Sequence, residues 1–372
     1  MTKNIPLKDR FPVVDSGANI FKPLFFRLSD QSQKIKLDAL ISVTPGIRIF
    51  DQIESQVIEL LKIRNPAKPL TDEQKQVTLS ALHDPGSDLY GVWVYYPWSA
   101  YLLHILDEQE FFELRTSRNK YKITADEQIL LARKKTGIIG LSVGQAIAIT
   151  MTIERLFGEV RLADFDDLEL SNLNRLRAGL HDLGTSKVLI AAREIAEIDP
   201  FVKVVPYFEG ITACNIDDFL TLEGNLDVLV EECDSMDIKI FSRLKAREYG
   251  IPVVMDTNDR GMLDIERFDL EPDRPILHGL IEHLPMKDLD QLKNLSNQEK
   301  LPYLAPMVGI EKISERLRNS VPEIGKTITT WPQLASSVVL GSAMVADTCR
   351  RIFLNEFTKS GRFYLDFEEI IS

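Results

Sequence analysis

Apolar and polar positions alternate in blocks between residues 136 and 256, and these blocks predict strands and helices in turn. Short apolar runs bounded by breakers are typical of buried strands, whereas longer stretches with apolar positions three or four apart are typical of helices. The expected strands are 136–141, 160–164, 202–207, 226–230 and 251–255, and the expected helices are 146–157, 186–198, 216–222 and 237–249. Strands that alternate with helices form βαβ units, so this pattern predicts a parallel sheet covered on both faces.

The two flanking regions follow other patterns. Before residue 114, short apolar runs are interrupted by turn clusters such as 65–69, and this mixture predicts a mainly helical N-terminal section. After residue 256 we expect a strand at 262–269, a solvated polar stretch at 288–300, a long apolar helix from Trp331 to Phe353, and a last strand at 363–367. The predicted plan is an N-terminal mixed section, 1–113, and an α/β domain, 114–372, with a mixed, mostly parallel sheet of Rossmann-like type.

Composition and charge narrow the classes of function. The 372 residues carry 44 Lys and Arg against 56 Asp and Glu, a net charge of −12. A protein that wraps nucleic acid needs a dominant basic surface, so we expect no nucleic-acid partner. Hydrophobic residues make up 44% of the chain, which is enough for a sizeable core and argues against disorder.

Cysteines and apolar segments indicate the compartment. The three cysteines, Cys214, Cys233 and Cys349, form no CxxC pair, so we expect neither a paired-cysteine zinc site nor a disulfide framework. Residues 1–10 lack the apolar stretch of a secretory signal, and every apolar run is far too short to cross a membrane. We therefore expect a cytoplasmic protein without a membrane partner.

A small-residue turn follows the first predicted strand of the α/β domain. The sequence Gly-Leu-Ser-Val-Gly at 140–144 lies where that strand leads into a helix. Small residues there let backbone N–H groups and the helix N-terminus approach a phosphate. The strict GxGxxG fingerprint is broken, because Ser142 stands at the second glycine position and Gln145 at the third. Gly140, Ser142 and Gly144 are the candidate phosphate-binding residues, although such turns also occur without a ligand.

Asp164 ends the second predicted strand, 24 residues after Gly140. A carboxylate at this place can accept hydrogen bonds from ribose hydroxyls. NAD and ATP would satisfy it equally, and it could also merely cap the next turn.

Three later residues favour ATP over NAD. Arg175 and Lys187 bring two cations toward a polyphosphate, and Asp234, after the fourth strand, offers a hard oxygen ligand for Mg²⁺. Hydride transfer has little use for such a set, whereas an enzyme that cleaves ATP must offset the charge that develops on the leaving pyrophosphate.

These residues carry a resemblance to the ThiF/MoeB/ubiquitin-activating enzyme family of adenylating proteins. The resemblance runs from about residue 115 to 269, plus the helix after Trp331, and it rests on three strings: Asp-Phe-Asp through Ser-Asn-Leu-Asn-Arg (164–175), Gly-x-x-Lys (184–187) and the acidic strand end at Asp234. It implies a mixed eight-stranded sheet, a homodimer, and attack by a substrate carboxylate on the α-phosphate of ATP–Mg²⁺. The products would be an acyl-adenylate and pyrophosphate.

The resemblance also assigns residues to roles. It implies catalytic roles for Arg118, Arg175, Lys187 and Asp234, with Asp234 as the metal ligand. Nucleotide contacts are implied for Gly140, Ser142, Gly144, Asp164, Asp166, Ser171, Asn172, Asn174, Arg175, Lys187 and Asp234. Arg118 lies in Arg-Thr-Ser-Arg-Asn (115–119), which is similar to an Arg-x-x-Arg-Gln box whose second arginine reaches the γ-phosphate across a dimer. A solvated basic segment is the alternative interpretation of this stretch.

Departures from the family pattern limit the expected chemistry. No cysteine lies between Asp256 and Trp331, where relatives that form a thioester carry their nucleophile, so we expect no thioester step. Some chains of this family continue into a nitroreductase-like domain; this one ends at Ser372, so any redox partner is expected to be a separate protein.

The expected function is therefore ATP- and Mg²⁺-dependent adenylation of a carboxylate. The substrate could be a peptide or small-protein C-terminus, as in ubiquitin-like modifier activation, or a small acid. The alternatives are a catalytically silent nucleotide- or partner-binding module, which the altered glycine loop favours, and an NAD(P)-dependent dehydrogenase.

Overall fold

The structure is a computed structural model that describes residues 19–83, 89–285 and 289–371. Its larger part is a seven-stranded sheet in the order β11-β10-β9-β8-β5-β6-β7. The five strands from β9 to β7 run parallel, whereas β10 and β11 are antiparallel to their neighbours. The mixed, mostly parallel α/β sheet predicted from the sequence is confirmed, but it has seven strands among the described residues instead of the eight that the resemblance implied. The strands are β5 (Lys135–Ile139), β6 (Glu159–Ala163), β7 (Lys203–Tyr207), β8 (Val228–Glu231), β9 (Val253–Thr257), β10 (Met262–Glu266) and β11 (Gly361–Tyr364).

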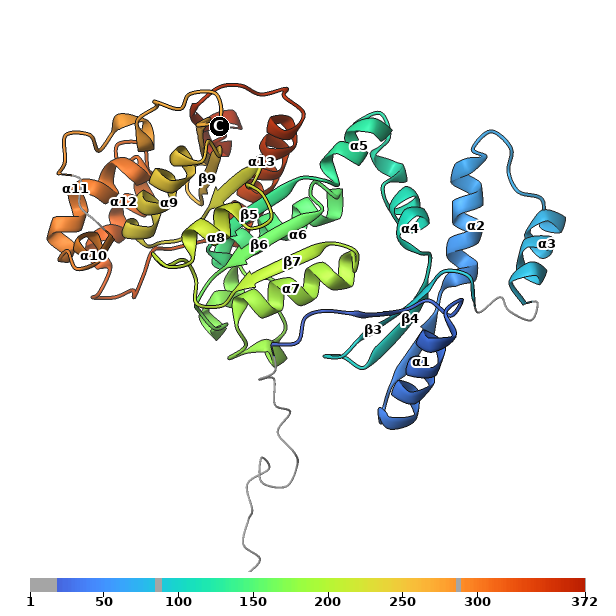
Figure 1. Cartoon of the computed structure of the whole chain (residues 1–372). Coiled ribbons are helices and arrows are strands. Elements are labelled where there is room, and N and C mark those ends of the chain that lie inside the picture. Colours follow the sequence, from blue (N-terminus) through green and yellow to red (C-terminus); the bar gives the residue numbers. More distant parts are fainter. Residues whose placement is uncertain (1–18, 84–88, 286–288, 372) are drawn as a thin grey trace, which may run out of the picture.

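Helices cover both faces of this sheet (Figure 1). One face packs against α6 (Leu141–Glu154), α7 (Lys187–Ile198) and α13 (Ala335–Phe353), whose apolar side chains share one core with the strands. The other face packs against α8 (Ile216–Thr221), α9 (Met236–Glu248), α10 (Leu289–Lys293) and α11 (Asn297–Val308). The helix α6 is buried on most of its surface because it lies between the sheet, α7 and α13. An apolar sequence on all sides is what such a position requires.

The N-terminal part contains a second, four-stranded sheet in the order β1-β3-β4-β2. Its elements are β1 (Leu24–Phe26), α1 (Gln31–Val43), β2 (Arg48–Asp51), α2 (Ile53–Arg64), α3 (Asp72–His83), β3 (Val92–Tyr96), β4 (Tyr101–Ile105) and α4 (Glu108–Arg115). This part joins the main domain through α4 and α5 (Ala125–Leu131), and its sheet packs on α7. The Tyr96 hydroxyl donates to the Ala196 carbonyl at 3.1 Å, and the Trp98 indole donates to Glu197 at 2.6 Å.

Two predicted elements near the C-terminus differ from the structure in extent, and a third, the solvated polar stretch, is mostly exposed as expected but partly helical. The helix expected from Trp331 begins only at Ala335, because the residue before a proline is disfavoured in helical conformation and Pro332 follows Trp331. The stretch 288–300, of which residue 288 lies outside the described residues, contains α10 and the start of α11, which is capped by Ser296 and Glu299. The last strand ends at Tyr364 and is followed by a short helix, α14 (Phe367–Ile370). Another short helix, α12 (Glu315–Ser320), lies earlier in the chain.

The described residues contain no helix that is long and apolar enough to cross a membrane.

Candidate active site

Two neighbouring cavities open where the parallel strands β5, β6, β8 and β9 end. The first, which we call the loop cavity, has a volume of about 110 Å³ and lies between the β5–α6 turn and the end of β6. The second, the Trp331 cavity, has a volume of about 140 Å³ and lies between the ends of β8 and β9 and the segment 331–333. Both are lined by the same three residues after β8: Glu232, Cys233 and Asp234. Ligands of open α/β sheets bind at this edge.

Gly140 brings the β5–α6 turn close to the end of β8. Its φ of 87° lies in the left-handed region, and a Cβ there would stand 2.7 Å from the backbone nitrogen of Cys233 and from the carbonyl carbon of Glu232. Only glycine fits a position that combines positive φ with such an approach. The turn therefore has the tight geometry that the sequence predicted for its first glycine.

Gly144 takes over the packing role of the missing third glycine. A Cβ on this residue would come 2.7 Å from Cγ2 of Ile138, so its absence lets α6 lie close to β5. Gln145, which occupies the third glycine position of the strict fingerprint, is buried instead and donates to the Arg177 carbonyl at 2.9 Å and to Glu194 at 3.0 Å. The departure from GxGxxG thus leaves the close packing of helix and sheet intact.

Asp164 holds the turn from the far side of the loop cavity. One of its carboxylate oxygens accepts from the Leu141 backbone N–H at 2.6 Å and the other from that of Asp166 at 2.8 Å. Burial raises the pKa of Asp164, while these two N–H donors lower it. Each oxygen keeps a second lone pair for a hydroxyl donor, so the carboxylate can fix the loop and still receive a ribose.

Lys187 lies beneath the loop cavity in the structure. Its ammonium, 4% exposed, donates to Asp166 at 2.8 Å and to the Ser142 hydroxyl at 3.2 Å, and both of these partners line the cavity. The three predicted residues Ser142, Asp166 and Lys187 are therefore brought together in one network. These two contacts leave the third N–H of the Lys187 ammonium without an acceptor among the described residues, so this N–H can donate to a ligand.

The segment around Arg175 lies beside the Trp331 cavity. Nη1 of Arg175 donates to the Asn174 side chain at 2.9 Å, and its buried Nε has no hydrogen-bond partner among the residues that the structure describes. Burial lowers the pKa of Arg175, whereas the negative charge of Asp234 raises it. Asn174 in turn donates to the Gln333 carbonyl at 2.8 Å and so ties this segment to the wall of the cavity.

Three other predicted residues line neither cavity. Asn172 is buried and accepts from the Glu169 backbone N–H at 3.0 Å, which shapes the short 3-10 turn before Arg175, while Ser171 is exposed on the same turn. Arg118 is exposed on a single turn after α4. Asn172 and Ser171 thus shape the turn before Arg175, and Arg118 lies outside both cavities of its own chain.

The end of β8 is the most charged part of the site. Glu231, fully buried, accepts from Lys239 at 3.1 Å and from Arg243 at 2.5 Å, and although burial opposes it, these cations lower its pKa. The Cys233 thiol donates to Glu231 at 3.0 Å. Burial and the adjacent carboxylate raise the pKa of this thiol well above its ordinary value. Asp234 is exposed and lines both cavities, as a metal ligand at their junction must.

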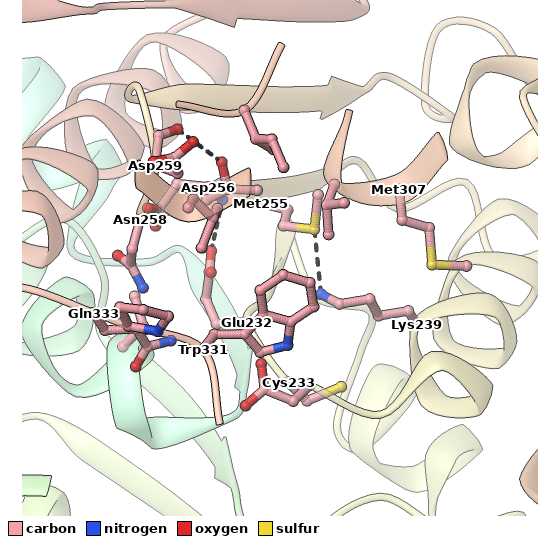
Figure 2. A pocket seen from close by; sticks show the side chains of 17 residues that line it. Glu232, Cys233, Lys239, Met255, Asp256, Asn258, Asp259, Met307, Trp331 and Gln333 are labelled. Carbon is pink, nitrogen blue, oxygen red and sulfur yellow. Dashed lines mark hydrogen bonds between the residues drawn. The ribbon is translucent and has the colours of Figure 1, made fainter. Parts of the chain in front are cut away.

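Two carboxylates that sequence reasoning did not assign meet in the Trp331 cavity. Glu232 accepts from the Asp256 backbone N–H at 2.9 Å, and Figure 2 shows its side chain extending toward Asp256. Burial raises the pKa of Glu232 well above its ordinary value, and repulsion by Asp256 adds to this effect. Burial also raises the pKa of Asp256 to about 7. The only signal in the sequence was the pair of acids, Glu231 and Glu232, directly before Cys233. Asp256 gave none.

Metal-ligating groups are sparse in this part of the chain. Within residues 19–83, 89–285 and 289–371, no cluster of three or more His, Cys, Asp or Glu side chains is arranged to hold a metal ion. A divalent cation bound at Asp234 therefore has to take further ligands from a bound molecule or from water.

Comparison with known proteins identifies the family. Residues 116–278 match the model of the ThiF family. Over 344 residues the chain is 40% identical to the uncharacterized protein MT1398 of Mycobacterium tuberculosis, an alignment that covers 92% of this chain and 45% of that protein. Over 153 residues it is 28% identical to tRNA threonylcarbamoyladenosine dehydratase 2 of Saccharomyces cerevisiae, which covers 41% of this chain and 34% of that one.

Among solved structures, the tRNA N6-threonylcarbamoyladenosine dehydratase TcdA of E. coli in complex with ATP has a TM-score of 0.47 at 16% identity, covering 66% of this chain and 95% of that chain. The chain spans less than half the length of the two curated relatives. The match at residues 116–278 falls on the β5–α6 turn, Asp164, Lys187 and the end of β8. Residues 116–278 are therefore a ThiF family domain, which makes up a little under half of the chain.

Proposed function

We propose that this protein adenylates a carboxylate: the substrate carboxylate attacks the α-phosphate of ATP, and acyl-adenylate and pyrophosphate leave the site. The observation that carries the proposal is the junction of two cavities at Glu232, Cys233 and Asp234. One cavity has the glycine turn of a nucleotide site, and the other offers a separate space for an acyl group. An adenylating enzyme needs two such spaces, because its two substrates must meet at one phosphorus atom.

The residues around the loop cavity fit ATP. The turn at Gly140 packs so closely against the end of β8 that no Cβ fits, and α6 begins beside the cavity, where the helix dipole favours negative charge. Asp164 keeps lone pairs for ribose hydroxyls. The ammonium of Lys187 supplies positive charge beneath this space, and Arg175, whose buried Nε has no partner among the described residues, supplies it beside the Trp331 cavity. Both charges can stabilise the phosphates as pyrophosphate departs.

The proposal assigns Mg²⁺ to Asp234. This exposed carboxylate at the junction would hold the ion together with phosphate oxygens and water, since Mg²⁺ commonly binds through one or two carboxylates plus phosphates. When bound, the ion would offset negative charge on the phosphates. The protein itself holds the two substrates on either side of Asp234 and keeps their reacting atoms in line.

We further propose that the acyl group passes directly from the adenylate to its acceptor, without a thioester. A thiolate is the nucleophilic form of cysteine, and the site opposes it. Cys233, the cysteine that lines the cavities, donates its proton to Glu231, and its pKa is raised. Cys349 is buried in α13 with a raised pKa, and Cys214 is exposed outside both cavities.

A homodimer with Arg118 acting in trans completes the proposal. Arg118 is solvent-exposed and lines neither cavity of its own chain. In a dimer, the Arg118 of one subunit would reach the phosphates bound in the other.

The test compares catalysis with binding in one pair of variants. Asp234→Asn keeps the shape of the side chain but removes its charge, so ATP–pyrophosphate exchange across a panel of carboxylates should fall about 10²- to 10³-fold. ATP affinity, measured by calorimetry, should change much less, because Gly140 and Asp164 are untouched. Asp273→Asn, at an exposed aspartate far from both cavities, is the matched control and should exchange normally. A protein that binds ATP but shows no exchange with any carboxylate would be a silent binding module, and the proposal would be wrong.

A further inference from the structure

Two buried carboxylates in the Trp331 cavity are not matched by a cation. Glu232 and Asp256 are 9% and 5% exposed, and both line the cavity. Neither oxygen of Asp256 has a hydrogen-bond partner in the part of the chain that the structure describes. The carboxylate lies against Gly341 of α13, where a Cβ would stand only 2.1 Å from Oδ2. Burying carboxylates in this way is costly unless a proton or a cation accompanies them.

The nearest cation is already engaged. Lys239 lines the cavity, but its ammonium donates to both oxygens of Glu231, at 3.1 and 3.2 Å. Of the other acids in the lining, Asp259 is bound by the backbone N–H and the hydroxyl of Ser314, each at 2.7 Å. The lining therefore holds two buried acids at the place where a substrate carboxylate has to approach ATP, and no lysine or arginine of the described residues donates to either of them.

Buried acids without a cationic partner among the described residues have a direct consequence for the substrate. A substrate that brings only a carboxylate offers neither of them a donor. A substrate that also brings an ammonium group supplies one, because this group can donate to Glu232 and pair with its charge.

Apolar side chains form much of the remaining wall of the cavity, beside the polar Thr257, Asn258 and Gln333. Val143, Met255, Met307 and Trp331 surround the acids, as Figure 2 shows for the last three. The volume of about 140 Å³ suits a single side chain. Apolar walls around a few charged groups are typical of a pocket that selects a small molecule.

We propose that the carboxylate substrate of this enzyme carries an amine beside its carboxyl group and an apolar side chain, as an apolar α-amino acid does, and that Glu232 binds the ammonium group. This inference rests on the proposed adenylation and names the substrate class of the same site. It favours a small amino acid over the C-terminus of a peptide, whose last nitrogen is an uncharged amide. Asp256, whose oxygens have no hydrogen-bond partner among the described residues, lines the same cavity next to Glu232.

The first experiment uses matched substrates. ATP–pyrophosphate exchange is measured at pH 7.5 with leucine, 4-methylpentanoate and N-acetylleucine, and with phenylalanine, 3-phenylpropanoate and N-acetylphenylalanine. We expect kcat/KM for the better free amino acid to exceed that of its des-amino and N-acetyl partners at least tenfold. Equal or faster exchange with a des-amino or N-acetyl compound would overturn the substrate class and leave adenylation itself standing. Absence of exchange with both amino acids would also overturn the substrate class. Whether the protein adenylates any carboxylate is tested separately by exchange with the wider panel of carboxylates.

The second experiment tests Glu232 without catalysis. Binding of 3-methylbutylamine and phenethylamine, which have the amine and the apolar group but no carboxylate, is measured by calorimetry. Glu232→Gln should weaken the better-bound amine at least tenfold, whereas Glu311→Gln, the same change at an exposed glutamate outside both cavities, should leave its binding unchanged. ATP binding reports that the variant is folded. Asp256→Asn provides a second variant and should weaken amine binding in the same direction.

The same variant also has to change selectivity. In Glu232→Gln, the preference for an amino acid over its des-amino partner should fall at least tenfold, because the site for the ammonium group is removed. Amine binding or substrate preference that is the same in Glu232→Gln and the wild-type protein would overturn the role of Glu232.

Discussion

Replacing Gly140 by alanine tests whether the glycine turn is a built nucleotide cradle. Alanine at a φ of 87° costs about 1 kcal/mol from backbone strain alone. The new Cβ would stand 2.7 Å from backbone atoms of Glu232 and Cys233, whereas ordinary contacts begin at 3.4 Å, so the turn or the end of β8 must move by about 0.7 Å. Overpacking of this kind costs about 1–3 kcal/mol more.

Gly250→Ala is the matched control, because Gly250 has a φ of 64° and open space where its Cβ would be. Urea denaturation should show a loss of about 1 kcal/mol for Gly250→Ala and of about 2–4 kcal/mol for Gly140→Ala. Calorimetry should show ATP affinity at least tenfold weaker in Gly140→Ala alone, because the displaced loop no longer presents its N–H groups to the phosphates. Equal stability losses in the two variants, with ATP affinity preserved, would refute the reasoning.

Three further predictions concern other parts of the site. Cys233→Ala should keep ATP–pyrophosphate exchange within about twofold and should form no less acyl product, because the thiol is held protonated; abolished product formation with normal exchange would reveal a thioester step. Burial raises the pKa of Asp256 to about 7, so the native state keeps this carboxyl protonated at pH values where the unfolded state has already ionised it. The wild-type protein should therefore lose stability as the pH rises from about 4 to 7, and the stability of Asp256→Asn relative to wild type should increase between pH 5 and pH 8. A constant difference in urea unfolding would contradict this. Mixing inactive Arg118→Ala with inactive Asp234→Asn should restore part of the exchange activity if the arginine acts across a dimer, and a fully active monomer on a sizing column would exclude that arrangement.

The sequence predicted the elements around the glycine turn well because their signals are local. An apolar run, a small-residue turn and an apolar helix follow one another directly, and Asp164 stands at the end of the next strand. The structure places all of them at one sheet edge. The helix after Trp331 was predicted to begin too early, because the apolar pattern was given more weight than the effect of Pro332 on its neighbour.

The acidic pair could not be predicted, because it depends on packing between distant segments. Asp256 lies in β9, one residue beyond the strand that the sequence predicted, and its carboxylate is packed against Gly341 on a helix far along the chain. Lys187 was expected near the phosphates, and the structure places it against Asp166 and Ser142; the contact with Asp166 depends on how the loop after β6 folds back. Side-chain partners of this kind follow from tertiary structure and leave no periodic signal in the sequence.

The central claim, that a carboxylate attacks the α-phosphate of ATP, is tested most directly by following oxygen. The enzyme is incubated with ATP, Mg²⁺, hydroxylamine and carboxylates labelled with ¹⁸O, and AMP and the trapped hydroxamate are analysed by mass spectrometry. Attack by the carboxylate leaves one of its oxygens on the phosphorus when hydroxylamine displaces AMP from the adenylate. The account predicts AMP that carries one ¹⁸O atom for each hydroxamate formed. Unlabelled AMP alongside the hydroxamate, or ADP and phosphate in place of AMP and pyrophosphate, would contradict it.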